Sequence, residues 1–289
     1  MSRVLITGAA GQLGSAIVRA FADREVVAHT RATLDVADPA AVRRAVADAA
    51  PSVIVNCAAY NAVDTAEDAP GDAFAVNAMA VRSLARAAED SGAAFVHFGT
   101  DFVFDGETDA PYGEETPPSP RSAYAMSKLV GEWFALEQPR GYVLRVESLF
   151  GTPHDWTGRR STLDGIVAGL EQGRAVRVFT DRIVSPSYVP DVAAATRHLL
   201  DSAAAPGLYH CVNSGRASWH DVAVETARLL GVAPRLDPVT MDQVVLKARR
   251  PRFCALDNSK LAAAGFRMPG WQDAVARWIA TRGPAVSIK

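Results

Sequence analysis

Residues 4–14 read VLITGAAGQLG, a short apolar strand that passes through a glycine-rich turn into the start of a helix. Gly8, Gly11 and Gly14 have the spacing of a dinucleotide-binding loop. Glycine has no Cβ, so a pyrophosphate can reach the backbone N–H groups of such a turn, and the helix dipole attracts it. The stretch predicts a Rossmann-type α/β fold with a dinucleotide site. The alternative is a glycine-rich turn that binds nothing.

The first half of the chain continues this alternation of strand and helix. Strands are expected at 4–7, 25–30, 52–57, 93–98 and 142–146, and helices near 12–23, 39–49, 72–91 and 121–137. Such an order is typical of a doubly wound parallel sheet. We therefore expect residues 1–150 to form an NAD(P)-binding Rossmann domain.

After Gly151 the pattern changes, because proline and glycine become frequent and the alternation stops. Helices are expected near 162–172 and 219–231, and short strands near 176–179 and 207–212. A further helix at 191–202 has one apolar face that suits a return to the first domain, so about 183–202 is assigned there. Residues 151–182 and 203–289 are then expected to form a smaller, mixed α/β substrate lobe.

Composition limits the classes of function. The 289 residues are 49% hydrophobic and 21% charged, with 30 basic and 32 acidic side chains and a net charge of -2. These values are typical of a globular protein and give no positive field for nucleic acid or an anionic membrane. We expect a small-molecule partner, no nucleic acid and no membrane. Because no signal-peptide pattern or membrane-length apolar run is found, the cytoplasm is the expected location.

The cysteines and histidines do not suggest a metal centre. Cys57, Cys211 and Cys254 are widely spaced, and neither a C-x-x-C pair nor a cysteine and histidine cluster of zinc spacing occurs. Reduced, structural thiols are expected. His97 falls in the fourth expected strand, where a hydrogen-bonded core histidine is more common than a ligand.

Tyr124 and Lys128 lie four residues apart in the helix expected at 121–137, so their side chains share one helix face. A phenol with a pKa of about 10 is a weak acid at neutral pH, but a lysine cation and a positive nicotinamide ring both stabilise the phenolate. Lysine occurs only four times in the chain, which makes this pairing informative. The pair predicts proton chemistry, against the alternative of an exposed helix pair.

Thr100 and Asp101 follow the fourth expected strand, at the sheet edge where open α/β proteins bind ligands. A substrate carbonyl held between the Thr100 hydroxyl and the Tyr124 phenol would be polarised for hydride attack. The alternative is that Thr100 and Asp101 only cap a loop.

The end of the second expected strand bears on the choice of cofactor. An NAD-specific site places a carboxylate there, but none occurs from residue 27 to residue 33, and Arg31 stands in this stretch. A guanidinium pairs with a 2′-phosphate by two hydrogen bonds. Arg31 therefore favours NADP(H), with NAD(H) as the alternative, unless it is only a solvated surface arginine.

These motifs resemble those of the extended short-chain dehydrogenase/reductases, and within them most of all the dTDP-4-dehydrorhamnose reductase family. The resemblance rests on the glycine loop, residues 56–60 (NCAAY), residues 100–106 (TDFVFDG), and Tyr124 with Lys128. It continues over nearly the whole chain through residues 207–210 (GLYH), 218–221 (SWHD), 250–252 (RPR) and 256–261 (LDNSKL).

The resemblance implies hydride transfer from a nicotinamide cofactor to C4 of a nucleotide-linked 4-keto-6-deoxyhexose. Tyr124 would donate the proton, and Lys128 would lower its pKa and hold the nicotinamide ribose. Thr100 would bind the reacting oxygen, and Asp101 would position the sugar. The resemblance also implies cofactor contacts at Gly8, Gly11, Gln12, Leu13 and Gly14 in the loop, at Asp35 and Val36 near the adenine, and at Ala59, Tyr60 and Asn61 after the third strand.

On the substrate side the chain departs from the family pattern. The small Ser148 stands where rhamnose-forming enzymes usually carry an aromatic substrate contact, and residues 181–187 (DRIVSPS) only loosely match a family loop. Ser148 and Arg252 are the expected substrate contacts. Arg252 could clamp the diphosphate together with Arg249 and Arg250, or the three could form a solvated basic turn.

Asn77 is expected either to order the active-site helix or to be a helix-surface amide. Two other functions stay open. One is a non-catalytic, NADP-binding regulatory subunit similar to the β subunit of methionine adenosyltransferase. The other is a nucleotide-sugar epimerase or dehydratase that uses the same tyrosine. Assembly as a homodimer is also left open.

Overall fold

A six-stranded parallel sheet forms the centre of the protein. The computed structural model describes residues 3–151 and 160–282, and its sheet has the strand order β10-β5-β4-β3-β1-β2. The strands are β1 (Arg3–Thr7), β2 (Glu25–His29), β3 (Val53–Asn56), β4 (Ala94–Thr100), β5 (Gly141–Val146) and β10 (Gly207–His210). All neighbours are parallel, which confirms the predicted doubly wound sheet.

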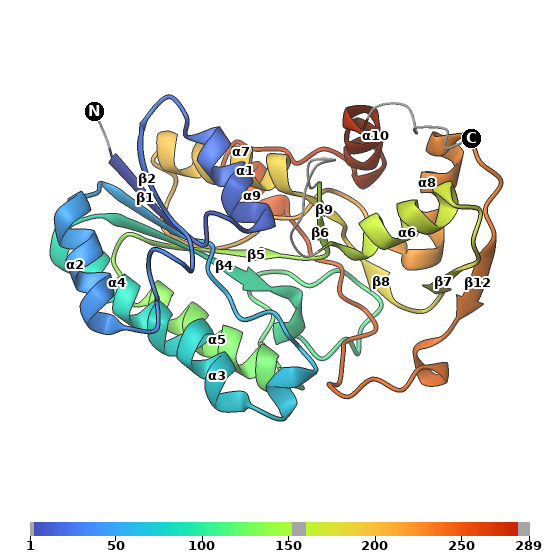
Figure 1. Cartoon of the computed structure of the whole chain (residues 1–289), viewed down its shortest axis with the longest axis horizontal. Helices are drawn as coiled ribbons and strands as arrows, with labels where there is room; N and C mark the ends of the chain where they lie inside the picture. The colour runs from blue at the N-terminus through green and yellow to red at the C-terminus, as the bar shows by residue number, and fades with distance from the viewer. Residues whose placement is uncertain (1–2, 152–159, 283–289) are drawn as a thin grey trace.

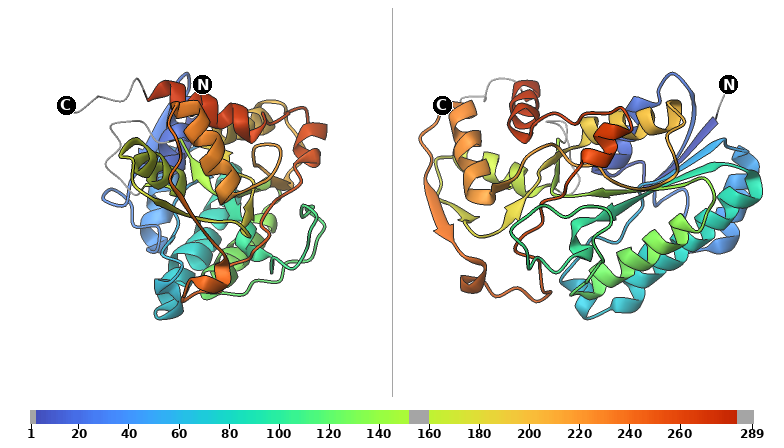
Figure 2. Two further views of the ribbon diagram at one scale, coloured as in Figure 1. Left: turned by 90° about the vertical axis from the view of Figure 1, so that its right-hand side faces the viewer. Right: turned by 180° about the vertical axis from the view of Figure 1, so that it is seen from behind.

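Helices cover both faces of this sheet (Figure 1), and Figure 2 shows the same layers from two other sides. One face carries α1 (Gln12–Ala20), α7 (Val189–Asp201) and the short α9 (Ser259–Ala263). The other carries α2 (Pro39–Ala49), α4 (Ala80–Ser91) and α5 (Ala123–Leu136). The helix expected to return at 191–202 is α7, and it packs against α1.

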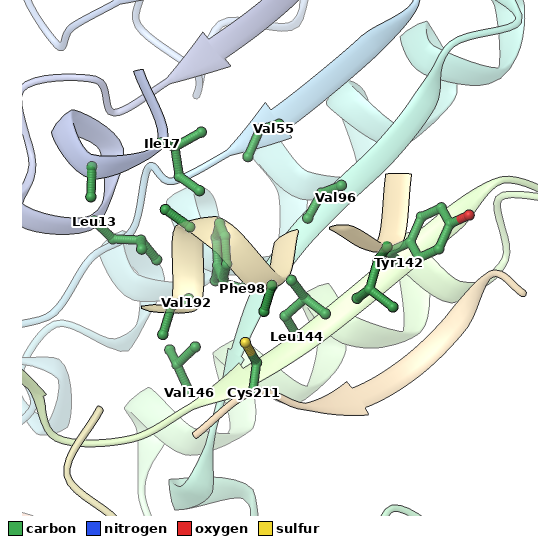
Figure 3. Close-up of a cluster of buried hydrophobic side chains, with 14 of the residues drawn as sticks. Leu13, Ile17, Val55, Val96, Phe98, Tyr142, Leu144, Val146, Val192 and Cys211 are labelled. Atoms are coloured by element: carbon green, nitrogen blue, oxygen red, sulfur yellow. The ribbon is translucent and has the colours of Figure 1, made fainter. Parts of the chain in front are cut away.

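Successive residues of a central strand enter different cores, because side chains alternate across a sheet. In β1, Val4 and Ile6 lie in the core beneath α1 and α7, whereas Leu5 lies in the core beneath α2 and α4. Figure 3 shows the first of these cores, where Ile17 of α1 and Val192 of α7 meet the strands. Burial of both faces explains why these strands read as continuous apolar runs.

A second group of elements lies beyond the carboxyl ends of the central strands (Figure 1). Its helices are α6 (Thr162–Glu171), α8 (Trp219–Leu230) and α10 (Trp271–Thr281). Its short strands pair as β6 (Leu149–Phe150) with β9 (Ser187–Tyr188), β7 (Val176–Phe179) with β12 (Leu236–Val239), and β8 (Ile183–Val184) with β11 (Ala217–Ser218). Phe150, Trp219 and Trp278 help to form a core of its own.

One segment assigned to the smaller lobe belongs to the central sheet. Residues 207–210 form β10, which pairs with β5, so placing this strand in the substrate lobe was wrong. Leu261 of α9 also packs in the core of the central sheet. A four-residue strand carries no pattern that tells one sheet from another, so the sequence alone could not place it.

A π-helical turn at Ala75–Met79 joins α3 (Pro70–Phe74) to α4, where the sequence predicts one regular helix over 72–91. Turns of this kind are often found at functional sites. This turn brings the carbonyl group of Asn77 against Gly131 of α5, where a Cβ would overlap the carbonyl oxygen. Contact between the turn and α5 therefore requires glycine at this position.

Within residues 3–151 and 160–282, no helix is both long and apolar enough to cross a membrane. Cys57, Cys211 and Cys254 are all free thiols, as expected.

Two glycine substitutions test the contact between α5 and the π-helical turn. We expect Gly131→Ala to lower the free energy of unfolding, because the new methyl group overlaps the Asn77 carbonyl oxygen. The matched control is Gly165→Ala on α6, where a Cβ meets nothing within 4 Å. There alanine should stabilise the protein by about 0.5–1 kcal/mol, because it has the higher helix propensity. Urea unfolding of both variants measures the difference. Equal effects would contradict the predicted overlap.

Candidate active site

The glycine-rich loop lies at the end of β1, where the winding of the sheet changes direction between β1 and β3. Gly8 has a φ of 66°, and a Cβ there would lie 2.6 Å from the N of Ala58. At Gly14 a Cβ would overlap the carbonyl oxygen of Gly8. Gly11 caps α1 without a side-chain hydrogen bond, and Nε2 of Gln12 is buried with no partner in the described chain. The loop is a cradle that requires glycine and presents polar groups to an anion.

Four further residues predicted to bind the cofactor lie around this loop. Leu13 packs into the core beneath α1, and Val36 is buried against α2. Arg31 and Asp35 are exposed and follow β2, which is the strand next to β1. The backbone of the loop, and not the Leu13 side chain, is therefore the part available to a ligand.

Asn77 ties the segment after β3 to α5. Its Oδ1 accepts from the N–H of Tyr60 at 2.8 Å, and its Nδ2 donates to the carbonyl of Tyr60 and to Oγ of Ser127, both at 3.0 Å. Because Asn77 is fully buried, it is not a surface amide. Its contacts hold Tyr60, and with it the flanking Ala59 and Asn61, against the helix that carries Tyr124 and Lys128.

One buried face of α5 carries polar groups at every fourth residue: Tyr124, Lys128 and Glu132. Tyr124 packs edge-on against Phe102, with ring centroids 5.6 Å apart. Nζ of Lys128 donates to the carbonyl of Phe98 at 2.5 Å. Burial lowers the pKa of Lys128 to about 8. The predicted pair is therefore buried, and the alternative of an exposed helix pair does not apply.

Thr100 ends β4 and caps the short 3-10 turn that follows it. Its Oγ1 accepts from the N–H of Phe102 at 3.2 Å and donates to Oδ1 of Asp101 at 3.0 Å. The loop-capping alternative is thus observed. The same strand end still lies against α5, because Oε1 of Glu132 accepts from the N–H of Thr100 and the ring of Phe102, two residues later, contacts Tyr124.

Glu132 and Arg145 join α5 to β5 and were not among the residues predicted from the sequence. Their buried ion pair has a shortest distance of 2.8 Å, and Oε1 of Glu132 also lies 3.4 Å from the N of Thr100 as a hydrogen-bond acceptor. Gly99 leaves room for this carboxylate, because a Cβ there would overlap Oε1. A glutamate four residues after Lys128 continues the same helix face, and this spacing was the available signal.

A buried cluster of Asp101, Glu147, Cys254 and Arg182 lies beside Thr100. A carboxylate oxygen of Asp101, a carboxylate oxygen of Glu147 and Sγ of Cys254 lie within 4.8 Å of one another. Arg182 supplies the positive charge among them. Burial raises the pKa of Asp101 to about 6 and that of Glu147 well above its usual range. Burial in this cluster therefore favours the protonated form of both carboxyl groups. Four separate segments supply it, so no local spacing in the sequence predicted it.

The two predicted substrate residues contact different groups. Ser148 has a φ of 43°, a strained value for a residue other than glycine, and its Oγ lies 3.5 Å from Oε1 of Glu147. Arg252 forms ion pairs with Asp242 and Asp181 and lines a cavity of about 520 Å³. Ser148 therefore borders the acid cluster, whereas Arg252 lies at the cavity.

The other two arginines of the predicted diphosphate clamp also face acids. Arg249 pairs with Glu107 at 3.1 Å, and Arg250 pairs with Asp64 at 2.7 Å. The basic segment is therefore held against the loops that follow β3 and β4. A phosphate group would have to compete with these carboxylates.

A model of the RmlD substrate binding domain family matches residues 2–283. The chain belongs to this family. A dTDP-4-dehydrorhamnose reductase of Streptomyces griseus is 38% identical over 272 residues, which cover 91% of this chain and 88% of that protein. A dTDP-4-keto-6-deoxy-D-glucose reductase of Streptomyces niveus is 36% identical over 273 residues, which cover 91% of each.

A crystal structure of dTDP-4-dehydrorhamnose reductase from Bacillus anthracis in complex with NADP has a TM-score of 0.90. It is 30% identical and covers 97% of this chain and 99% of that one. The resemblance inferred from the sequence is confirmed, and this RmlD family member is an oxidoreductase of the short-chain dehydrogenase/reductase type.

In this RmlD family member, Asp101 should make stability depend on pH. Its pKa is raised from 3.8 to about 6, so the folded protein keeps a proton that the unfolded chain releases. This contribution is present below pH 4 and is lost as the pH rises through about 6. The Asp101→Asn variant has no carboxyl group at this position, so it does not lose stability in this way as the pH rises. We therefore expect the free energy of unfolding of the variant, relative to wild type, to rise by about 2–3 kcal/mol between pH 4 and 7.

Asp105→Asn is the matched control, because Asp105 has a lowered pKa and should give the opposite trend. Denaturant unfolding at several pH values measures both variants. A difference for Asp101→Asn that stayed constant with pH would contradict the buried-acid interpretation.

Proposed function

We propose that this chain reduces the C4 keto group of a nucleotide-linked 4-keto-6-deoxyhexose, with NADPH preferred over NADH. The observation that carries the proposal is the buried pair of Tyr124 and Lys128 on α5, a helix whose Lys128 and Glu132 bond the backbone at the end of β4, where Thr100 stands. The names of the relatives support the substrate class, since both are reductases of dTDP-linked sugars. We assign the central sheet, including β10, to cofactor binding and the smaller lobe to substrate binding.

The residues of the glycine loop fit a nicotinamide dinucleotide. A Cβ at Gly8 or Gly14 would overlap the backbone of Ala58 or of Gly8, so only glycine allows this tight turn, and the buried Nε2 of Gln12 would gain a partner in a pyrophosphate oxygen. Arg31 would pair with a 2′-phosphate, which matches the NADP bound by the Bacillus anthracis relative. The reduced nicotinamide would supply a hydride, and NAD(H) remains the second choice.

The chain's own residues would supply the proton and hold the reacting oxygen. Tyr124 would donate a proton to the substrate oxygen, and Lys128 would stabilise the phenolate left behind. In the structure the Thr100 hydroxyl donates to Asp101. Once Asp101 is protonated, it can donate to Oγ1, and the hydrogen of Thr100 can turn toward the substrate oxygen. The pKa of about 6 makes that form accessible near neutral pH.

Ser148 and Arg252 are the proposed substrate contacts. The small Ser148 would leave room where related reductases place an aromatic ring, so a sugar with a different substituent pattern would fit. Arg252, which is half exposed, would exchange an acidic partner for a phosphate of the nucleotide.

The direct test is to follow the absorbance of reduced nicotinamide when the protein meets freshly prepared dTDP-4-keto-6-deoxyhexose. We expect NADPH to be oxidised faster than NADH. Binding of NADPH without oxidation would contradict the reductase proposal and support the regulatory alternative. Stoichiometric NAD retained through purification would support the epimerase or dehydratase.

Tyr124→Phe removes the proposed proton donor in this assay. We expect turnover to fall by about 10²-fold or more while NADPH still binds. Tyr209→Phe is the matched control, because the Tyr209 hydroxyl donates to the carbonyl of Ala205 outside the site. Turnover close to wild type in Tyr124→Phe would contradict the assignment.

Arg31→Ala tests the cofactor preference separately. Loss of the guanidinium should weaken the binding of NADPH by about tenfold or more and leave the binding of NADH nearly unchanged, because only NADPH carries the 2′-phosphate. Arg86→Ala, an exposed arginine of α4, is the control. Fluorescence titration with both cofactors measures the affinities. Equal losses for the two cofactors would show that Arg31 does not read the 2′-phosphate.

A further inference from the structure

Three polar side chains form a buried row across the carboxyl ends of neighbouring strands. Thr7 of β1 is the register partner of Asn56 in β3, and Asn56 is the register partner of His97 in β4. Register partners in parallel strands point to the same face of the sheet. All three are at most 2% exposed. The row leads from the glycine loop to Lys128 of α5.

Hydrogen bonds fix the orientation of the Asn56 amide. Its Oδ1 accepts from the N–H of Ala58 at 3.1 Å and from Oγ1 of Thr7 at 2.6 Å. A backbone N–H can only donate, so the oxygen must face Ala58. The Nδ2 group is then the one that lies 3.1 Å from Nδ1 of His97.

This orientation sets the tautomer of His97. An amide NH₂ group only donates, so Nδ1 of His97 must accept. Burial lowers the pKa of His97 well below its usual range, so the imidazole is neutral and carries its single hydrogen on Nε2. Nε2 lies 3.5 Å from Nζ of Lys128. The histidine therefore points a donor, and not an acceptor, at the lysine.

The other groups around Lys128 do not offset this donor with a direct negative contact. No carboxylate of the described residues forms an ion pair with Nζ, whose acceptor is the carbonyl of Phe98. Glu132, one turn along α5, is bound by Arg145. Cys57 at the end of β3 has a pKa raised by burial and stays a neutral thiol. Tyr124 lies one turn back on the same helix.

We propose that Asn56 holds His97 as its Nε2–H tautomer and that this tautomer keeps Lys128 in exchange between ammonium and amine, so that Lys128 is not a fixed cation. A neutral amine has a lone pair that can accept the Nε2–H, whereas an ammonium faces a second donor there. Asn56 and His97 are positioning residues, because they act on Lys128 and do not touch the substrate. The inference deepens the proposed function, since it concerns the same lysine.

The first measurement is made on the wild-type protein, and a variant serves only to assign one signal. Ring ¹⁵N shifts of the wild-type protein report the tautomer of each of the six histidines, and a His97→Phe spectrum identifies the signal of His97. We expect a neutral ring with its hydrogen on Nε2 from about pH 6 upward. A hydrogen on Nδ1, or a charged ring, would overturn the proposal.

The second measurement reverses the tautomer. In Asn56→Asp, one carboxylate oxygen keeps the bonds from Ala58 and Thr7, and the other accepts from Nδ1–H of His97. Nε2 then becomes an acceptor for the Lys128 ammonium. We expect the titration midpoint of Lys128 to rise by about one pH unit or more. Nζ spectra with ¹⁵N-lysine are suited to this because the chain has only four lysines, and Lys128→Met assigns the signal.

A new carboxylate would also attract the lysine through space, and a second background separates the two effects. In the His97→Phe background, Asn56→Asp has no tautomer to reverse, so its effect on Lys128 should shrink. Asn258→Asp controls for added charge, because the Asn258 side chain donates to Val212 and Ser214, which are not part of α5. An equal shift with and without His97, or no shift at all, would overturn the proposal.

These spectra need neither cofactor nor substrate, so they remain informative if the keto-sugar assay fails. If the reductase proposal also holds, the alkaline limb of the pH profile of kcat should move with the Lys128 midpoint in Asn56→Asp. A limb that stayed in place while Lys128 moved would contradict the link between this row and catalysis.

Discussion

The buried ion pair between Glu132 and Arg145 is the contact on which the arrangement of the candidate active site depends. Both side chains are at most 4% exposed, and the carboxylate also accepts from the N–H of Thr100. A buried pair of this kind adds little net stability, but removing one partner leaves an unpaired charge that costs about 3–5 kcal/mol. Its main effect is positional. It holds α5, with its tyrosine and lysine, in a fixed relation to the end of β4.

Most of the fold follows from local pattern. The sequence predicts a strand at 4–7 and a helix at 121–137, and the structure has Arg3–Thr7 and Ala123–Leu136. Alternation of strand and helix also gives the parallel sheet, because the connections leave few other topologies. The pattern did not place β10 in the right sheet, because a four-residue strand is too short to be specific. It also did not predict the π-helical turn, because one extra residue in a helical turn hardly changes the apolar period.

The candidate site divides in the same way. Tyr124 and Lys128 could be paired from the sequence because one helix carries both. Glu147 and Arg182 could not, since they meet Asp101 only after distant segments fold together. His97 was expected to be a hydrogen-bonded core histidine, and the structure confirms that it is buried and bonded to Asn56. Its register with Asn56 depends on how β3 and β4 pair, and no single stretch of sequence shows this.

Burial moves an acid and a base toward each other on the pKa scale at this site. The pKa of the Asp101 carboxyl is raised to about 6, and the pKa of the Lys128 ammonium is lowered to about 8. In each case the main cause is that burial disfavours the charged form. On an exposed surface the same residues would be a permanent anion and a permanent cation, and neither would exchange protons near neutral pH. Within this fold, Thr100 borders the acid and Tyr124 lies one turn from the base. The two groups proposed to hold the substrate oxygen are therefore each next to a residue that can gain or lose a proton under working conditions.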